Sequence, residues 1–360
     1  MKNTKIFMAA VLSMATFSVF SAHATSVSSG TAAGVSTLVG AVAAPTAAAQ
    51  AAGIVASNIA GSVGGAVGGV GAPAAGAVPV GFAPMKVFNL RQQMAMKGGS
   101  AAADNARGIN AWLSGGYTHI KSTDVGGNFD GPVLNANLGV DRKFGDRFTV
   151  GLTAGYENLD IDTTFNRGTF EGDGYSVGPY VNFKINNNWS VMGLVTYTWL
   201  NYDVTTGTVR STGSFDAERL TGVATLNGSF RKDKWVFSPM AGVMGMAEDQ
   251  DSYRDSRGVL INGDNIPLVR WSAGGTVGYD FGKITPYVKL VGEYDSSHSA
   301  AVDLGSNRKS SDTREGAVAG AGFSLNLGRG MTANLEGTYN SVGRENLEVY
   351  SVKGRLAFEF

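Results

Sequence analysis

The chain has 360 residues, with 29 Lys plus Arg and 29 Asp plus Glu, so its formal net charge is zero. This balance argues against a protein that coats a polyanion such as DNA. Charged residues make up 16% of the chain and glycine accounts for 51 residues, whereas a soluble globular chain carries about 25% charged residues and about 7% glycine. The composition disfavours a soluble enzyme and leaves fibrous, low-complexity and β-barrel membrane proteins. Cysteine is absent, which excludes a disulfide framework, a Cys-based metal site and a thiol nucleophile.

The first 24 residues have the pattern of a secretory signal peptide. Lys2 and Lys5 precede an apolar run from Ile6 to Phe20, and small residues then lead to Ala24. A basic start, a short apolar core and an A-x-A type site are typical of such a leader. The apolar run is short for a membrane-spanning helix. We therefore expect export, with cleavage after Ala24.

Residues 25–84 form an uncharged segment rich in Ala, Gly and Val. Small residues recur at every fourth position from Gly53 to Gly69. Such spacing permits close helix packing in membranes, but Ala and Gly bury little apolar area, and a low-complexity arm is the main interpretation. Residues 85–109 then suit a linker or plug helix, which Gly98 and Gly99 would interrupt.

From residue 110 to the end, apolar and polar residues alternate with a period of two, as in β-strands with two different faces. In the last strand, Tyr350, Val352, Leu356 and Phe358 share one face, and the opposite face carries charges. The pattern predicts an all-β fold, a twelve-stranded antiparallel transmembrane β-barrel. The predicted strands are 110–122, 132–144, 147–161, 173–185, 189–204, 217–231, 235–249, 267–281, 284–296, 314–327, 331–341 and 347–360.

Charges in the middle of strands decide which face meets lipid. A Lys or Arg near the middle of the bilayer costs about 2–4 kcal/mol on the lipid face of a barrel, and a buried charge in a dry core needs a partner. The polar face is therefore predicted to line a wet lumen. A structural lumen with salt bridges to a plug is the main interpretation, and an ion-selective path is the alternative. The predicted lumen charges are Asp141, Glu157, Arg219, Arg270, Lys289, Glu293, Glu336, Lys353 and Arg355.

The predicted connections alternate between short turns and longer loops. Short turns are expected at 145–146, 186–188, 232–234, 282–283 and 328–330. Longer loops are expected at 123–130, 163–172, 205–215, 249–265 and 297–312, with a shorter one at 341–345. Short turns at one rim and long loops at the other, with aromatic residues capping the apolar faces, are typical of outer-membrane barrels.

Residues 110–360 resemble the β-domain of autotransporters, the proteins of type V secretion. The resemblance rests on the run from Gly139 to Tyr156 and on segments 175–180, 213–219, 235–239, 274–279 and 356–360. It implies a twelve-stranded barrel with a helix in the lumen, located in the outer membrane of a Gram-negative bacterium among lipid and lipopolysaccharide. It also implies periplasmic chaperones and assembly by the barrel-assembly machinery, which reads a terminal strand ending in Phe. The residues that fit this terminal signal are Phe360, Phe358, Leu356 and Tyr350.

Motifs for catalysis or metal binding are weak. Residues 174–178 match G-x-S-x-G, but that motif needs a strand-to-helix turn, and here it lies within a predicted strand. His23, His119 and His298 have no metal-ligand spacing. The acidic group Glu248, Asp249, Asp251 and Asp255 is interpreted as a solvated loop, with weak cation contact or contact bridging to lipopolysaccharide as the alternative. We expect no enzyme activity, no cofactor and no nucleic-acid partner.

Two functions remain open at this point. In the first, the barrel is a translocator that anchors or exposes a very short passenger, residues 25–84, at the cell surface. In the second, it is a standalone outer-membrane barrel that acts as a small-solute channel, an adhesin or a structural protein. The position of residues 25–84 relative to the membrane distinguishes them.

Overall fold

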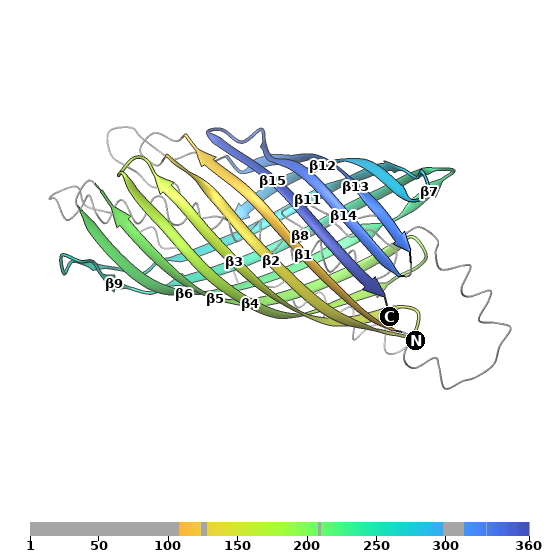
Figure 1. Cartoon of the computed structure of the whole chain (residues 1–360), viewed down its shortest axis with the longest axis horizontal. Helices are drawn as coiled ribbons and strands as arrows, with labels where there is room; N and C mark the ends of the chain where they lie inside the picture. The colour runs from red at the N-terminus through yellow and green to blue at the C-terminus, as the bar shows by residue number, and fades with distance from the viewer. Residues whose placement is uncertain (1–107, 124–127, 208–209, 298–312, 329, 360) are drawn as a thin grey trace.

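The protein is an antiparallel β-barrel whose long strands are strongly tilted (Figure 1). The computed structural model describes residues 108–123, 128–207, 210–297, 313–328 and 330–359. Among these residues there is no helix long and apolar enough to cross a membrane. The strands that form the barrel are β1 (Ile109–Ser122), β2 (Phe129–Phe144), β3 (Phe148–Thr163), β4 (Gly168–Lys184), β5 (Trp189–Thr206), β6 (Ser211–Gly228), β8 (Trp235–Gln250), β11 (Asn265–Tyr279), β12 (Ile284–Ser297), β13 (Glu315–Gly328), β14 (Met331–Val342) and β15 (Leu347–Glu359).

The barrel closes where its last strand meets its first. Each long strand pairs with the next along the chain, and β15 pairs with β1 from Asn110↔Glu359 to Ser122↔Leu347. A hydrogen bond of 2.9 Å from Thr118 Oγ1 to Ser351 Oγ crosses this seam inside the barrel. Closure pairs every long strand on both sides, which satisfies the backbone polar groups without water. The predicted twelve-stranded antiparallel all-β barrel is confirmed.

The N-terminal part of the prediction falls mainly outside the described residues. This holds for the signal peptide 1–24 with its cleavage site, for the segment 25–84 and for residues 85–107 of the expected helix. At the boundary, Ile109 was expected in the helical segment but begins β1. It pairs with Arg142 of β2, because the alternating pattern of the strand already starts there.

Two expected long loops are short turns instead. Strands β3 and β4 run on to Thr163 and Gly168, and β5 and β6 run on to Thr206 and Ser211. The residues expected to form loops at 163–172 and 205–215 were therefore wrongly assigned. In the structure, Gly172 and Gly213 of these ranges make room for the rings of Tyr202 and Tyr253. A Cβ on Gly172 would lie 2.6 Å from the ring of Tyr202.

The two rims of the barrel differ. We call the end with the connections 145–147, 185–188 and 280–283 the turn rim, and the C-terminal end of β15 lies there. Next to the 185–188 and 280–283 turns, β7 (Phe230–Lys232) adds a short extension. The opposite end, the loop rim, carries the hairpin of β9 (Tyr253–Arg254) and β10 (Leu260–Ile261) (Figure 1).

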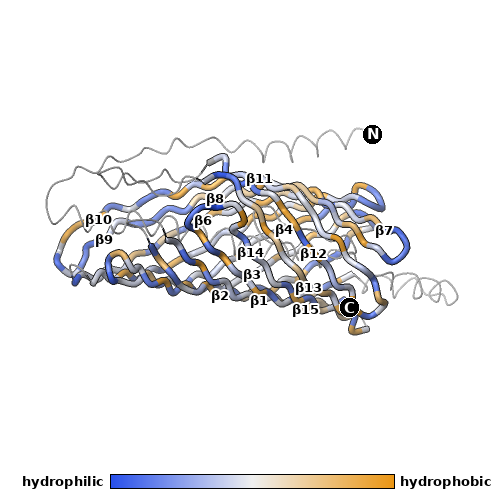
Figure 2. Tube along the Cα trace, turned by 90° about the horizontal axis from the view of Figure 1, so that it is seen from above, coloured by the Kyte–Doolittle hydropathy of each residue, from blue (hydrophilic) through white to orange (hydrophobic). Residues whose placement is uncertain are grey.

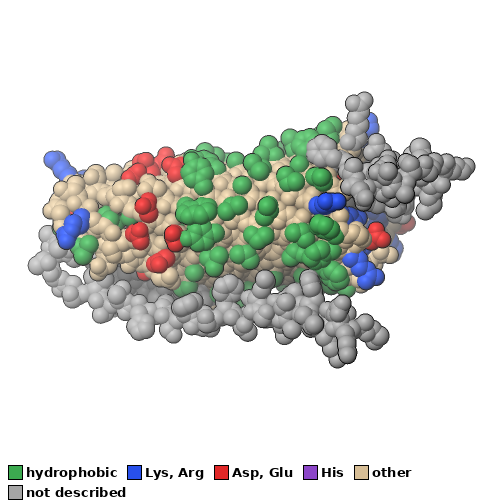
Figure 3. Space-filling view, turned by 90° about the horizontal axis from the view of Figure 1, so that it is seen from below, with side chains coloured by type: hydrophobic (Ala, Val, Ile, Leu, Met, Phe, Trp, Pro, Cys, Tyr) green, Lys and Arg blue, Asp and Glu red, His purple; other side chains and the backbone are tan. Residues whose placement is uncertain are grey.

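The outer surface has an apolar band that does not cover the whole barrel. Figure 2 shows hydrophobic positions concentrated along the strands and hydrophilic ones at the two ends. In Figure 3 the apolar side chains gather toward the turn rim. A row of acidic side chains lies next to them, on the side of the loop rim. Within β3, Leu152 is 63% exposed on this band, and Asp160 and Asp162 are exposed further along the same face. The strands therefore extend beyond the apolar band toward the loop rim.

Candidate functional site: the lumen of the barrel

The inward face of the strands changes character along the barrel axis. In β3, the inward residues Thr149, Thr153 and Glu157 are buried and polar, and the next two inward residues, Leu159 and Ile161, are buried and apolar. At the level of Leu159 and Ile161, the outward residues of β3 change from apolar to acidic. Above the apolar band, the barrel thus resembles a soluble protein, with apolar residues inside and charges outside.

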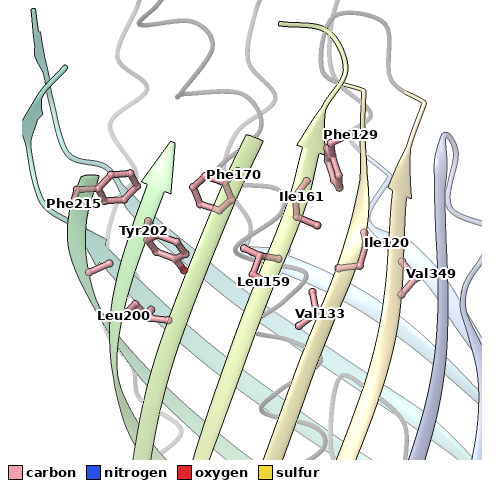
Figure 4. Packing of buried hydrophobic residues seen from close by; sticks show 11 residues of the cluster. Ile120, Phe129, Val133, Leu159, Ile161, Phe170, Leu200, Tyr202, Phe215 and Val349 are labelled. Atoms are coloured by element: carbon pink, nitrogen blue, oxygen red, sulfur yellow. The ribbon is translucent and has the colours of Figure 1, made fainter. Parts of the chain in front are cut away.

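An apolar collar lines the lumen near the loop rim (Figure 4). Its rings stack from strand to strand, with centroids 4.8 Å apart for Phe170 and Tyr202 and 5.3 Å apart for Tyr202 and Phe215. Tyr253 of β9 continues the stack at 5.1 Å from Phe215. A polar lumen was expected along the whole barrel, and the collar corrects this. The collar consists of Ile120, Phe129, Val133, Leu159, Ile161, Phe170, Leu200, Tyr202, Phe215, Ala217 and Val349.

Below the collar, Arg219 of β6 bridges two glutamates. Its Nε donates to Glu248 Oε2 at 2.8 Å, and its Nη1 donates to Glu157 Oε1 at 2.8 Å. The Glu157 side chain lies over Gly174, where a Cβ would approach its Cγ to 2.8 Å. The first glycine of the G-x-S-x-G match thus makes room for a salt bridge, within strand β4. Arg219 is 2% exposed and Glu248 is fully buried, so the bridge is shielded from solvent.

A second network joins β11, β12 and the β14–β15 connection. Arg270 binds Asp295 through Nε and through Nη2, the latter at 2.9 Å. Arg344 reaches in from the connection and donates to Asp295 Oδ2 at 3.0 Å. Glu293 Oε2 lies 3.6 Å from Arg270 Nη1 and 3.5 Å from Arg344 Nη2. Two cations and two anions therefore balance each other.

The third network lies between β12 and β14. Lys289 Nζ pairs with Glu336 Oε1 at 2.9 Å, and both side chains are fully buried. Tyr287 donates its hydroxyl to Glu336 Oε2 at 2.9 Å. Both oxygens of this carboxylate are thus engaged on the inner wall.

The fourth network lies closest to the turn rim and is built around Asp141. Asn110 donates to Asp141 Oδ1 at 2.7 Å, Tyr180 donates to Oδ2 at 2.7 Å, and Trp112 Nε1 donates to the Tyr180 hydroxyl at 2.9 Å. Gly139 lies beneath the Trp112 indole, and a Cβ there would collide with the ring. Glycine at this position lets a large ring lie flat on the inner wall.

All nine residues predicted as lumen charges occupy buried positions of the barrel strands. They are Asp141, Glu157, Arg219, Arg270, Lys289, Glu293, Glu336, Lys353 and Arg355. The salt bridges of Arg219 with Glu157 and Glu248, of Arg270 with Asp295 and of Lys289 with Glu336 join strands of the barrel to one another. Sequence reasoning did not include Glu248, Asp295 and Arg344 in this set. Glu248 and Asp295 each lie on the inward alternation of their strand, which was the available signal.

The acidic group near residue 250 is not uniformly solvated. Glu248 points into the lumen, while Asp249 and Asp251 are exposed. Asp255 closes the β9–β10 hairpin by accepting hydrogen bonds from Ser211 Oγ at 2.7 Å and from the Val259 amide at 2.8 Å. Burial opposes ionisation of Asp255, but these bonds and the Arg257 guanidinium outweigh it and lower the pKa of the carboxyl below its usual range.

The remaining predicted site residues form no catalytic or metal arrangement within the described ranges. His119 is half-exposed and its Nε2 lies 2.8 Å from Asp130 Oδ1. No group of three or more His, Asp or Glu side chains suited to a metal is found among the described residues. Of the proposed terminal signal, Tyr350 and Leu356 are exposed on the apolar outer face, at 51% and 42%. Phe358 lies on the same strand, and Phe360 lies outside the described residues.

Three solved structures with a similar fold are parts of autotransporters. The structure aligns with the translocator domain of the autotransporter NalP from Neisseria meningitidis, with a TM-score of 0.60 and 15% identity over 75% of this chain and 95% of that one. It aligns with the β-domain of the Bordetella autotransporter BrkA at a TM-score of 0.58 and 18% identity, over 70% of this chain and 100% of that one. The transport unit of AIDA-I from Escherichia coli gives 0.56 and 16%, over 76% and 97%.

These alignments show a shared fold at low identity, and no curated protein sequence matches the chain. The sequence itself provides the family. The family model of the autotransporter β-domain matches residues 111–338, which is more than half of the chain and spans most of the barrel. The chain belongs to the autotransporter β-domain family.

Proposed function

We propose that the barrel is a translocator in the outer membrane of a Gram-negative bacterium, and that it exposes residues 25–84 at the cell surface as a very short passenger. The main support is the position at which the chain enters the barrel. Strand β1 begins at Ile109 on the turn rim, beside the C-terminal end of β15. Outer-membrane barrels have their short turns in the periplasm. A segment that precedes Ile109 must therefore pass through the lumen to reach the outside.

The length of the chain is sufficient for this path. Crossing about 30 Å takes about 20 residues in a helix at 1.5 Å per residue, or fewer if extended. Residues 85–108 supply 24 positions, so the uncharged segment would start near the loop rim. Residues 25–84 contain no Asp, Glu, Lys or Arg, and a segment without charge passes a narrow lumen at a low desolvation cost.

The role we propose is not enzymatic. Most carboxylates of the described lumen are engaged by other side chains, as Glu157 is by Arg219, and His119 is paired with Asp130 on the outer side. Proteolytic or lipolytic work needs a nucleophile activated by a base that is itself held by a third group. We also propose that the barrel-assembly machinery and periplasmic chaperones insert the barrel, with Phe360, Phe358, Leu356 and Tyr350 as the terminal signal.

A protease-accessibility experiment on intact cells tests the surface exposure of the passenger. A protease site is inserted near Thr31 in the full chain, and folded barrel is identified by its heat-modifiable migration on gels. We expect cleavage from outside. The same site inserted at Asp233 on the turn rim should be protected, and one at Gly258 in the β9–β10 hairpin should be cleaved. Complete protection at Thr31, with both controls as expected, would refute the proposal and favour a standalone barrel.

A further inference from the structure

Two buried cations on β15 have no partner among the described residues. Lys353 and Arg355 are 5% and 4% exposed on the inner wall. Lys353 Nζ makes no hydrogen bond, and neither do Arg355 Nε and Nη2. A buried charge without a partner is strongly unfavourable. The other buried guanidinium groups of the lumen strands, such as Arg219, are paired, so these two cations stand out.

The carboxylates on neighbouring strands bind other donors, and no hydrogen bond or salt bridge joins them to Lys353 or Arg355 among the described residues. Glu336 lies opposite Lys353 on β14, but its two oxygens accept from Lys289 Nζ and from the Tyr287 hydroxyl. Asp141 accepts from Asn110 through one oxygen and from Tyr180 through the other. The two cations are therefore available to an additional anion.

Further donors surround the same part of the wall. Across β1, Lys353 lies opposite Gly116 and Arg355 lies opposite Ser114. Gly116 in turn lies opposite Asn135 of β2. Asn135 Nδ2 and Ser114 Oγ are buried without hydrogen-bond partners among the described residues. Because Gly116 has no side chain, β1 places none between Lys353 and Asn135 at this level of the wall, and the Cα atoms of these two residues are two strand spacings or about 10 Å apart.

We propose that this part of the inner wall, formed by Lys353, Arg355, Ser114, Asn135 and Gly116, is a binding site for an oxyanion, a carboxylate or phosphate group. Such a group supplies several acceptor oxygens and negative charge together, which is what two cations and two neutral donors require. A neutral ligand would leave both cations uncompensated.

The oxyanion has two possible sources. One is the carboxylate of Asp104, since residues 25–108 contain no other Asp or Glu. It precedes β1 by five positions and lies outside the described residues. The other source is a free anion that enters the lumen from solution. Both sources present the same chemistry to Lys353 and Arg355, and removing the Asp104 carboxylate separates them.

Thermal unfolding of the full-length refolded protein in detergent, with inorganic phosphate or with chloride at matched ionic strength, tests the site. The variants are Lys353→Gln, Arg355→Gln and Asp104→Asn, with Lys283→Gln in an exposed turn as the matched control. Phosphate also stabilises folded proteins non-specifically, so the observable is the phosphate-dependent rise in Tm relative to Lys353→Gln. At one hundred times Kd, a specific site should raise Tm by roughly 5 °C.

Each outcome decides between these alternatives. A phosphate-specific rise in the unmodified protein and in Lys283→Gln, absent from Lys353→Gln and Arg355→Gln, supports a site for a free oxyanion. A rise that appears only in Asp104→Asn supports Asp104 as the resident carboxylate. If phosphate raises the Tm of neither the unmodified protein nor Asp104→Asn by more than it raises that of Lys353→Gln, the proposal is wrong. Loss of a buried unpaired cation should not prevent folding, and heat-modifiable migration verifies this for both Gln variants.

Discussion

Removing Arg219 should destabilise the barrel more than removing any rim cation. The variant Arg219→Met keeps an unbranched apolar stem and removes the guanidinium that lies 2.8 Å from both Glu157 and Glu248. These two carboxylates are 7% and 0% exposed, so they would remain as two buried anions without their cation. The perturbation tests whether the barrel wall at this level is dry.

The expected loss is about 3–5 kcal/mol, the usual cost of breaking a buried ion pair by removing one partner. At about 2–4 °C per kcal/mol for a domain of this size, the melting temperature should fall by roughly 10 °C. Circular dichroism melting of the refolded full chain, together with the heat-modifiable gel shift, measures this. The control is Arg231→Met, because the Arg231–Asp280 pair lies at the turn rim with the arginine 32% exposed. We expect that variant to lose about 0–1 kcal/mol.

A matched rescue makes the test stricter. The triple variant Arg219→Met, Glu157→Gln and Glu248→Gln removes all three charges and should recover most of the lost stability, because no uncompensated charge remains. If Arg219→Met melts within about 2 °C of Arg231→Met, the reasoning is wrong. The carboxylates would then be solvated, and the lumen below the collar would be wet.

Three further predictions concern the inner wall, the lipid face and the loop rim. Gly139→Val should cost about 1–3 kcal/mol, because the new side chain collides with the Trp112 indole; an unchanged melting temperature would contradict the packing. Leu152→Arg should reduce the free energy of folding into lipid vesicles by about 2–4 kcal/mol, while Leu260→Arg in the β9–β10 hairpin should leave it unchanged. Equal losses in the two variants would refute the position of the apolar band. Asp255→Asn should unprotect the hairpin amides in hydrogen exchange at neutral pH. Since the pKa of Asp255 is lowered on folding, its stabilisation is present above its ordinary pKa of 3.8 and is lost as the pH falls below it; hairpin protection that is independent of pH in the unmodified protein would contradict this.

The strands could be predicted because the lipid-facing and lumen-facing residues alternate regardless of tertiary detail. The ends of the strands could not, because the alternation reverses its polarity above the apolar band. In β3, for example, the apolar residues Leu159 and Ile161 face inward and alternate with the outward Asp160 and Asp162, which reverses the pattern of the preceding residues. The reversal itself is readable in the sequence, as apolar residues that move from one face of the strand to the other.

The partners in the salt bridges could not be predicted from the sequence, for a different reason. Arg219 and Glu157 are 62 positions apart and lie on strands separated by two others. Their contact depends on the length of the arginine side chain and on the missing side chain of Gly174 between them. Alternation identifies which residues face inward, but the choice of partner depends on tilt and register, which only the closed barrel specifies.

The seam between β1 and β15 also constrains when this protein can fold. Its pairs join residues more than two hundred positions apart, as with Thr118 and Ser351, and such non-local contacts form slowly. Until the last strand has been synthesised, the sheet has two unpaired edges, each open to another chain. A chain that ends before β15 would therefore be prone to aggregate, and the nascent protein must be kept unfolded until its final residues are available.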